Sequence, residues 1–369
     1  MTNTQTADLT ARFHGLLGTE PDDPYWTTLR RADGLHHSVG HLLLSLWESD
    51  HDVDLSPAAE AVLLRQRART EVYREQERRL RAAGVRFRVV KGQSIGDLYP
   101  EGMFRSQTDM DVVVDSPDGL WAAAELVRSG GMDDEVHLTL INGDTTELYV
   151  ALVREAEDPF YDKPLSVEVS TALHFGDLDS VPLRSGVSDD PVVANILAVC
   201  EERFQRRFHP RDAVDLDVLS RALGPGRLGT LVERAEALRL LPELRELTDL
   251  AASVGLASPL DDLERPTPAD VERERERRRE ARGEAAPELL FGVRLTTEPV
   301  TEASRSPQPL ELEGHRVLLS PLGAFLLVTK HSVAQDQAEA ALDAVRRRLR
   351  SAGDPGERVS HREGTENSA

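Results

Sequence analysis

The chain has 369 residues, and its 44 lysine and arginine residues against 65 aspartate and glutamate residues give a formal net charge of −21. Binding of nucleic acid without sequence preference needs clustered positive charge, so this balance argues against long DNA or RNA and against an anionic membrane as partners. At roughly 100–200 residues per domain, the length predicts about two to three domains.

The cysteine content limits the disulfides and metal sites that the chain can form, and the hydropathy indicates its cellular compartment. Cys200 is the single cysteine, which excludes an intrachain disulfide and a zinc site built from several thiolates. It follows an apolar stretch and is expected to be a small buried side chain. No apolar run approaches the ~20 residues of a membrane span, and residues 1–10 lack the pattern of a signal peptide. We therefore expect a cytoplasmic protein without membrane contact.

The first half of the chain predicts helices followed by a small α/β unit. Apolar residues within the first 55 positions predict short helices. Ser56–Pro57 and Ser116–Pro117 have the pattern of helix starts, and Gly84 that of a helix end. Alternating or β-branched segments predict strands. These segments are 85–90, 109–114, 137–141, 148–153 and 165–169.

The second half predicts a helical region and a C-terminal segment of mixed structure. Residues 264–282 mix arginine with glutamate, which is typical of a solvated helix or linker, with a partner-binding helix as the alternative. Strands or buried elements are expected at 289–295 and 315–328, before a helix at 335–350. The predicted domains are N-terminal helices (1–55), an α/β core (56–180), a helical domain (181–262), a charged helix or linker (263–287), a C-terminal α+β segment (288–351) and a disordered tail (352–369).

The most informative pattern is Asp109-Met110-Asp111 at the start of a predicted strand. Side chains at i and i+2 share one face of a strand, about 7 Å apart along it, so the two carboxylates point the same way. Carboxylates aimed at one point repel each other unless a cation lies between them, and oxygen ligands of this kind favour Mg²⁺ together with substrate phosphates. By itself the pattern is also typical of a solvated strand end.

A second pattern lies just upstream, at Lys91–Gly92. A glycine directly after a strand allows backbone amides to approach a phosphate, and the lysine adds a point charge. Ser94 could add a hydroxyl or cap the short helix that follows. Arg105 could pair with the carboxylates or face a triphosphate.

These residues resemble the uncharacterised nucleotidyltransferase family of the DNA polymerase β superfamily, and the related abortive-infection (AbiEii-type) nucleotidyltransferases. The match covers 90–170 at the motif level, with weaker support to about residue 223. The family signature, roughly Leu-Lys-Gly, Tyr-Pro, Arg-Pro and Asp-Ile-Asp-Leu-Leu-Val, falls on Val90-Lys91-Gly92, Tyr99-Pro100, Arg105-Ser106 and 109–114. With the predicted elements, it implies an α/β (α+β) nucleotidyltransferase core, a helical second domain and a small C-terminal α+β appendage.

The resemblance also implies further site residues. Glu168 stands where the family carries a third metal-binding acid, and it is the candidate to take the acceptor's proton. Asp212 and Asp215 match a helical motif that faces the nucleotide, although acidic residues are also favoured at a helix N-terminus. Arginines beside this motif could contact a triphosphate or form a charged helix surface. They are Arg203, Arg206, Arg207 and Arg211.

The implied reaction is Mg²⁺-dependent transfer of a nucleoside monophosphate group from a nucleoside triphosphate, expected to be ATP, with release of pyrophosphate. The acidic charge favours a small-molecule, peptide or protein acceptor. By analogy with family members from organisms of similar composition, the resemblance implies a role in natural-product biosynthesis. Two departures from the family pattern, Gln93 and Ser170, motivate an alternative: a catalytically decayed nucleotide-binding or scaffolding protein. A toxin-like nucleotidyltransferase of a phage-defence pair is a further alternative.

Overall fold

The chain divides into two compact units in a computed structural model. The first unit is Met1–Val136 with Ile141–Glu288, and the second is His137–Leu140 with Leu289–Ala369. The structure describes residues 3–50, 53–143, 145–184, 186–261, 263, 265–282, 286–300, 307–330 and 332–353. From residue 354 onward the predicted disordered tail therefore lies outside the described residues.

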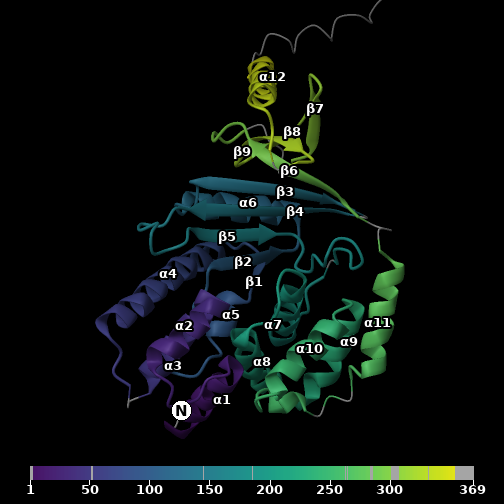
Figure 1. Cartoon of the computed structure of the whole chain (residues 1–369). Coiled ribbons are helices and arrows are strands. Elements are labelled where there is room, and N and C mark those ends of the chain that lie inside the picture. Colours follow the sequence, from purple (N-terminus) through teal and green to yellow (C-terminus); the bar gives the residue numbers. More distant parts are fainter. Residues whose placement is uncertain are drawn as a thin grey trace, which may run out of the picture. The chain divides into compact units, whose positions relative to one another are not determined.

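Helices precede the first strand, as the sequence predicts (Figure 1). They are α1 (Asn3–Leu17), α2 (Tyr25–Leu35), α3 (His37–Ser49) and α4 (Pro57–Ala82). The hydroxyl of Ser56 accepts a hydrogen bond from the amide of Ala59 at 3.3 Å, so it is the expected N-cap of α4. Gly84 follows the helix with φ +70°, a backbone angle that favours glycine.

The first unit contains a mixed sheet in the order β1-β2-β5-β4. Strand β2 is antiparallel to β1 and parallel to β5, whereas β4 is antiparallel to β5. Val112, Val113 and Val114 of β2 are all buried, as expected for an interior strand covered on both faces. The predicted strands and intervening helices are thus confirmed. Their bounds are β1 (Phe87–Val90), α5 (Gly92–Gly96), β2 (Asp109–Val114), α6 (Pro117–Ser129), β3 (Glu135–Asn142), β4 (Thr146–Arg154) and β5 (Leu165–Ser170).

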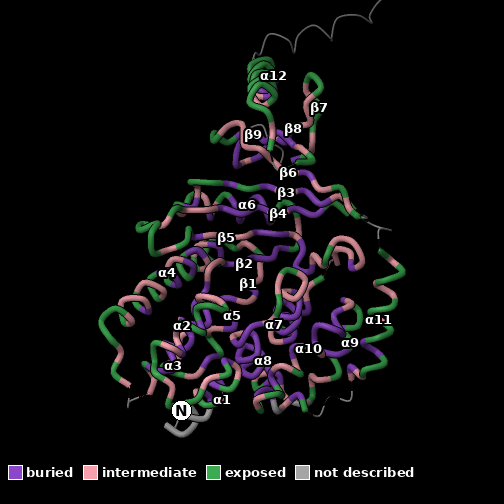
Figure 2. The backbone as a smooth tube through the Cα atoms, in the orientation of Figure 1, coloured by how far each residue is buried: buried purple, intermediate pink, exposed green. Residues whose placement is uncertain are grey.

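The helical part of the first unit shares one hydrophobic core with the N-terminal helices. Leu42 and Leu43 of α3 belong to the same buried cluster as Leu197 of α7 and Leu216 of α8. Figure 2 shows α7 and α8 buried along most of their length. Cys200 is fully buried in this cluster, as predicted. The helices are α7 (Pro191–Glu201), α8 (Pro210–Leu223), α9 (Leu228–Ala237), α10 (Leu241–Ala252) and α11 (Pro268–Glu280).

The second unit is a small α+β element with its own core. Its strands form the order β6-β9-β8-β7, each antiparallel to the next. Val317, Leu326 and Val345 are buried together between the strands and the last helix. The predicted element 315–328 is a hairpin, and β7 is an additional edge strand. The bounds are β6 (Glu288–Arg294), β7 (Pro309–Leu312), β8 (His315–Ser320), β9 (Gly323–Val328) and α12 (Gln335–Gly353). Within the described residues, every helix is too short or too polar to span a bilayer.

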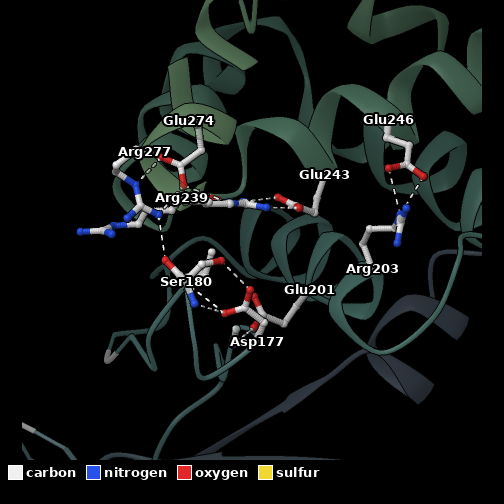
Figure 3. Close-up of polar contacts among 12 residues, drawn as sticks. Asp177, Ser180, Glu201, Arg203, Arg239, Glu243, Glu246, Glu274 and Arg277 are labelled. Carbon is white, nitrogen blue, oxygen red and sulfur yellow. Dashed lines mark hydrogen bonds and ion pairs between the residues drawn. The ribbon is translucent and has the colours of Figure 1, made fainter. Parts of the chain in front are cut away.

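The arginine-rich helix α11 is docked along one side by ion pairs (Figure 3). The guanidinium of Arg278 pairs with Glu243 of α10, with nitrogen–oxygen distances of 2.7 and 2.8 Å, and with Glu274 at 3.0 Å. Arg277 donates to the backbone oxygen of Ser180 at 3.1 Å. The opposite side of α11 is exposed, as expected for a solvated helix. The charged residues of α11 therefore form ion pairs with the rest of the unit on one side and contact solvent on the other.

We predict that Arg278→Ala lowers the free energy of unfolding by about 2–4 kcal/mol, because it leaves the carboxylate of Glu243 buried without its partner. The side chains of Arg278 and Glu243 are only 15% and 7% exposed. Arg275→Ala is the matched control on the same helix, since its side chain is 53% exposed and should change stability by less than about 0.5 kcal/mol. Urea denaturation measures both, and equal losses would contradict a docking role.

Candidate functional site

The register of strands β2 and β5 brings the candidate carboxylates together. In this parallel pair Asp111 lies directly opposite Glu168, and Asp109 lies opposite Ser166. Directly opposed residues share a face of the sheet, and so do residues two apart on one strand. Asp109, Asp111 and Glu168 therefore project from the same face. The local pattern predicted the first two, and the family resemblance supplied the third.

Burial and the neighbouring acids raise the pKa values of Asp111 and Glu168. Burial raises the pKa of Asp111 to about 6, an effect that Lys91 opposes and Asp109 reinforces. Burial also raises the pKa of Glu168 to about 7, with further upward contributions from Asp111 and Asp109. The hydroxyl of Tyr149 forms a hydrogen bond with Glu168. Asp109 thus disfavours ionisation of both Asp111 and Glu168, and Asp111 disfavours ionisation of Glu168.

Lys91 neutralises part of this negative charge. Its ammonium nitrogen lies 3.0 Å from Oδ2 of Asp111 and 2.6 Å from Oε1 of Glu202. Burial alone lowers the pKa of Lys91, but the two carboxylates outweigh burial and shift it upward. Glu202 was not predicted as a site residue, since nothing in its spacing distinguishes it from the charged residues around it.

The turn after β1 is tight and is held from α7. Lys91 has φ +56° and Gly92 has φ +38°. The side-chain oxygen of Asn195 accepts hydrogen bonds from the amide of Lys91 at 2.7 Å and from the hydroxyl of Ser94 at 3.0 Å. Ser94 also donates to the backbone oxygen of Lys91 at 2.7 Å. Its hydroxyl therefore stabilises the turn. The signal for Asn195 in the sequence was a polar residue within an apolar helix.

Arg105 pairs with α8 and not with the strand carboxylates. Its Nε and Nη2 each donate to Asp215 at 2.7 Å, while the hydroxyl of Tyr99 donates to Oδ1 of Asp215 at 2.6 Å. Arg105 also donates to the backbone oxygen of Gly92 at 3.2 Å. Burial opposes ionisation of Asp215, but Arg105 outweighs it and lowers the pKa of this carboxyl. The predicted residues Arg105 and Asp215 are thus joined to each other.

Asp212 caps the N-terminus of α8. It accepts a hydrogen bond from the backbone amide of His209 at 2.9 Å, and Arg206 donates to both of its carboxylate oxygens at 2.7 and 3.0 Å. This is the arrangement that the preference of helix N-termini for acidic residues would produce. Asp212 nevertheless lies beside the other predicted residues.

A cavity of about 190 Å³ borders most of these groups, but Glu168 and Ser94 do not line it. Its lining brings together most of the predicted residues with others that the sequence did not indicate. The lining residues are His36, Lys91, Gly92, Arg105, Gln107, Thr108, Asp109, Asp111, Val199, Glu202, Arg206, Arg211, Asp212 and Asp215. Gln93 and Ser170, the departures from the family pattern, do not line the cavity. The side-chain amide of Gln93 donates to Asp97, and the hydroxyl of Ser170 donates to the backbone oxygen of Ala172 at 2.7 Å.

The carboxylate oxygens of the cavity fit a hard divalent cation that is also coordinated by the phosphates of a substrate. Among the described residues, no three His, Cys, Asp or Glu side chains are grouped closely enough to hold a metal by themselves. Mg²⁺, however, is typically bound by one or two carboxylates together with water and substrate phosphates. Asp109 and Asp111 line the cavity and offer carboxylate oxygens of this kind.

Helix α4 anchors the beginnings of both strands that carry the acids. The hydroxyl of Tyr73 donates to the backbone oxygen of Thr108 at 2.7 Å and accepts from the amide of Ser166 at 3.2 Å. Arg69 donates to the same oxygen of Thr108 at 2.8 Å and also contacts the backbone oxygen of Pro164. The relative position of the carboxylates therefore depends on two side chains of one helix.

Comparison with known families identifies one match. Residues 35–255 match the sequence model of a family described as "Uncharacterised nucleotidyltransferase". This span is more than half of the chain and contains every residue of the cavity. No curated protein and no solved structure matches the chain.

We predict that Glu168→Gln removes a pH dependence of stability. The folded-state pKa of Glu168, about 7, lies above its ordinary value of 4.5, so the bound proton stabilises the folded state. This contribution is complete below about pH 4.5 and is lost as the pH rises through about 7. Glu168→Gln should therefore match the wild type near pH 4 and exceed its free energy of unfolding by about 1–3 kcal/mol near pH 8.

The measurement is urea denaturation in metal-free buffer across this pH range. Glu155→Gln is the control, because Glu155 is exposed and lies outside the site. A difference between Glu168→Gln and the wild type that does not change with pH would contradict the prediction.

Proposed function

The chain belongs to the uncharacterised nucleotidyltransferase family, as its motifs predicted, and on this premise we propose a Mg²⁺-dependent reaction with ATP as the donor. A nucleoside monophosphate group is transferred to an acceptor and pyrophosphate is released. The observation that carries the proposal is the convergence of Asp109, Asp111 and Glu168 on one face of the sheet, beside a cavity that also contains cationic side chains.

Asp109, Asp111 and Glu168 are the proposed metal ligands, and substrate phosphates and water would complete a site that these carboxylates do not form by themselves. Bound Mg²⁺ would neutralise negative charge on the phosphates and favour departure of pyrophosphate. Lys91, Gly92 and Ser94 are proposed to hold the β- and γ-phosphates at the turn after β1. Because the ammonium of Lys91 lies 3.0 Å from Asp111, it is already beside the proposed metal position.

Glu168 is the proposed general base. An acceptor oxygen or nitrogen attacks the α-phosphorus, the bond from this phosphorus to the bridging oxygen breaks, and the acceptor's proton passes to Glu168. Glu168 lies opposite Asp111 in the parallel pair of β2 and β5, so its carboxylate is beside the proposed metal position, where it could accept a proton from the acceptor. The hydrogen bond from Tyr149 orients the carboxylate.

Arg105, Asp212 and Asp215 are proposed to position the nucleotide from the helical side. All three line the cavity, and the contacts of Arg105 with Asp215 and with the backbone oxygen of Gly92 hold α8 against the turn after β1. The acceptor is proposed to be a small molecule, a peptide or a protein, because a net charge of −21 disfavours long nucleic acid. A role in natural-product biosynthesis would fit such an acceptor.

Asp109→Asn should lower nucleotide transfer by about 100-fold or more while leaving the fold intact, because it removes a charge from the proposed metal site. The assay incubates the protein with each α-labelled nucleoside triphosphate and a host extract, and measures label in each fraction. Chelation of divalent metal should abolish the same signal.

Asp115→Asn is the matched control for this assay. Asp115 follows β2 directly, its side chain is 55% exposed, and it pairs with Arg86 at 3.3 Å, away from the cavity. The control should transfer label at the wild-type rate. Undiminished incorporation by Asp109→Asn, with the thermal melt unchanged, would overturn the assignment of the metal site.

A further inference from the structure

The charged residues that line the cavity are almost completely matched with one another. Lys91 pairs with Asp111 and Glu202, and Arg105 pairs with Asp215. Arg206 pairs with Asp212 at 2.7 Å and with Glu202 at 3.4 Å. A cation whose charge is already balanced by carboxylates attracts a further anion less strongly than an unpaired cation does.

Arg211 is the exception among the cations. It lines the cavity from the first turn of α8, yet within the described residues it has no hydrogen bond or ion pair, and its Nε is buried without a partner. Burial and the neighbouring Arg105 lower the pKa of its guanidinium, and the carboxylates of Asp215 and Asp212 only partly oppose this shift. A partly buried guanidinium whose Nε has no partner is less favourable than a paired one, and binding of an anion would supply the missing partner.

The other arginines near the helical motif differ from Arg211. Arg203 pairs with Glu246 (Figure 3), and its Nε lies 2.7 Å from Oε1 of Glu246. Arg206 is engaged by Asp212. Arg207 is exposed and does not line the cavity. Of the four arginines near the helical motif, Arg211 is therefore the one that lines the cavity without an ion-pair partner among the described residues.

Gln107 supplies a second, independent observation. This residue is only 4% exposed, its amide nitrogen has no hydrogen-bond partner, and it lines the same cavity. A side chain at Gly92 would place a Cβ 2.5 Å from Oε1 of Gln107, so the glycine leaves the space that the amide occupies. Buried amide groups are usually hydrogen-bonded, so this donor is available to a ligand.

Asp109 is the corresponding exception among the acids. It lines the cavity, and no hydrogen bond or ion pair is found for its side chain within the described part of the chain. The cavity therefore leaves one carboxylate, one guanidinium and one amide donor without partners. A ligand that carries both a divalent cation and a chain of phosphates would satisfy all three.

We propose that Arg211 and Gln107 bind the polyphosphate chain of the nucleotide across the cavity from the turn at Lys91–Gly92, and that Arg211 makes the enzyme select triphosphates over monophosphates. This inference rests on the proposed function, and it assigns to Arg211 a role that the spacing of the arginines did not single out.

The test compares binding of ATP, AMP and inorganic tripolyphosphate, each with Mg²⁺, by titration calorimetry. Arg211→Gln should weaken binding of ATP and tripolyphosphate by about 10- to 100-fold, as expected for loss of a charge-assisted hydrogen bond, and that of AMP by less than about threefold. Arg207→Gln is the matched control, because it removes the same charge from an exposed position and should leave all three affinities unchanged.

The thermal melt without ligand separates binding from a structural role. Arg211→Gln removes a charge that has no partner, so its Tm should equal or exceed that of the wild type. A lower Tm with unchanged ATP affinity would overturn the proposal and make Arg211 structural. Equal weakening of ATP and AMP would also overturn it, because Arg211 would then not distinguish the outer phosphates.

The labelled-transfer assay distinguishes failure of this inference from failure of the proposed function. If the wild type transfers label and Arg211→Gln transfers it with the same KM for ATP, only the inference fails. If ATP and tripolyphosphate bind through Arg211 but Asp109→Asn transfers label undiminished, the inference stands and the assignment of the metal site fails. If the wild type binds neither compound, both fail.

Discussion

The cavity depends on one buried ion pair, between Arg105 and Asp215. The side chains are only 4% and 1% exposed, and the pair joins the segment before β2 to the middle of α8. Removal of two charges from water offsets much of their attraction, so such a pair contributes less to stability than to the choice of one arrangement. Tyr99 and the backbone oxygen of Gly92 complete the hydrogen bonds of the two side chains. The turn after β1 is thereby placed opposite α8.

The sequence predicted the parts of the site that depend on local periodicity. The shared face of Asp109 and Asp111 follows from the two-residue repeat of a strand, and the start of α6 from Ser116 followed by proline. Glu168 is different, because its position opposite Asp111 depends on parallel pairing of strands that are distant in the sequence. No local pattern reveals that register. The family resemblance indicated this residue, and the structure places it in the same group of carboxylates.

The partners of the predicted residues could not be predicted, because they come from elements far away along the chain. Lys91 meets Glu202, and the turn is held by Asn195, only after α7 packs beside β1. The docking of α11 through Arg278 has the same origin, since its mixed charge pattern is equally typical of a helix in solvent. The short edge strand β7 has too few residues to display a period. Tertiary packing decides each of these features.

The backbone of Lys91 has a consequence for the balance between stability and activity. Its φ of +56° and ψ of −140° lie near a region that is favourable almost only for glycine, and a residue with a side chain there is strained by about 1–3 kcal/mol. Glycine at this position would relax the turn but would remove the ammonium that balances Asp111 and Glu202. The chain thus retains a less stable backbone in exchange for a fixed positive charge. Selection for thermostability alone would be expected to favour substitutions at this turn, and these substitutions would reduce activity.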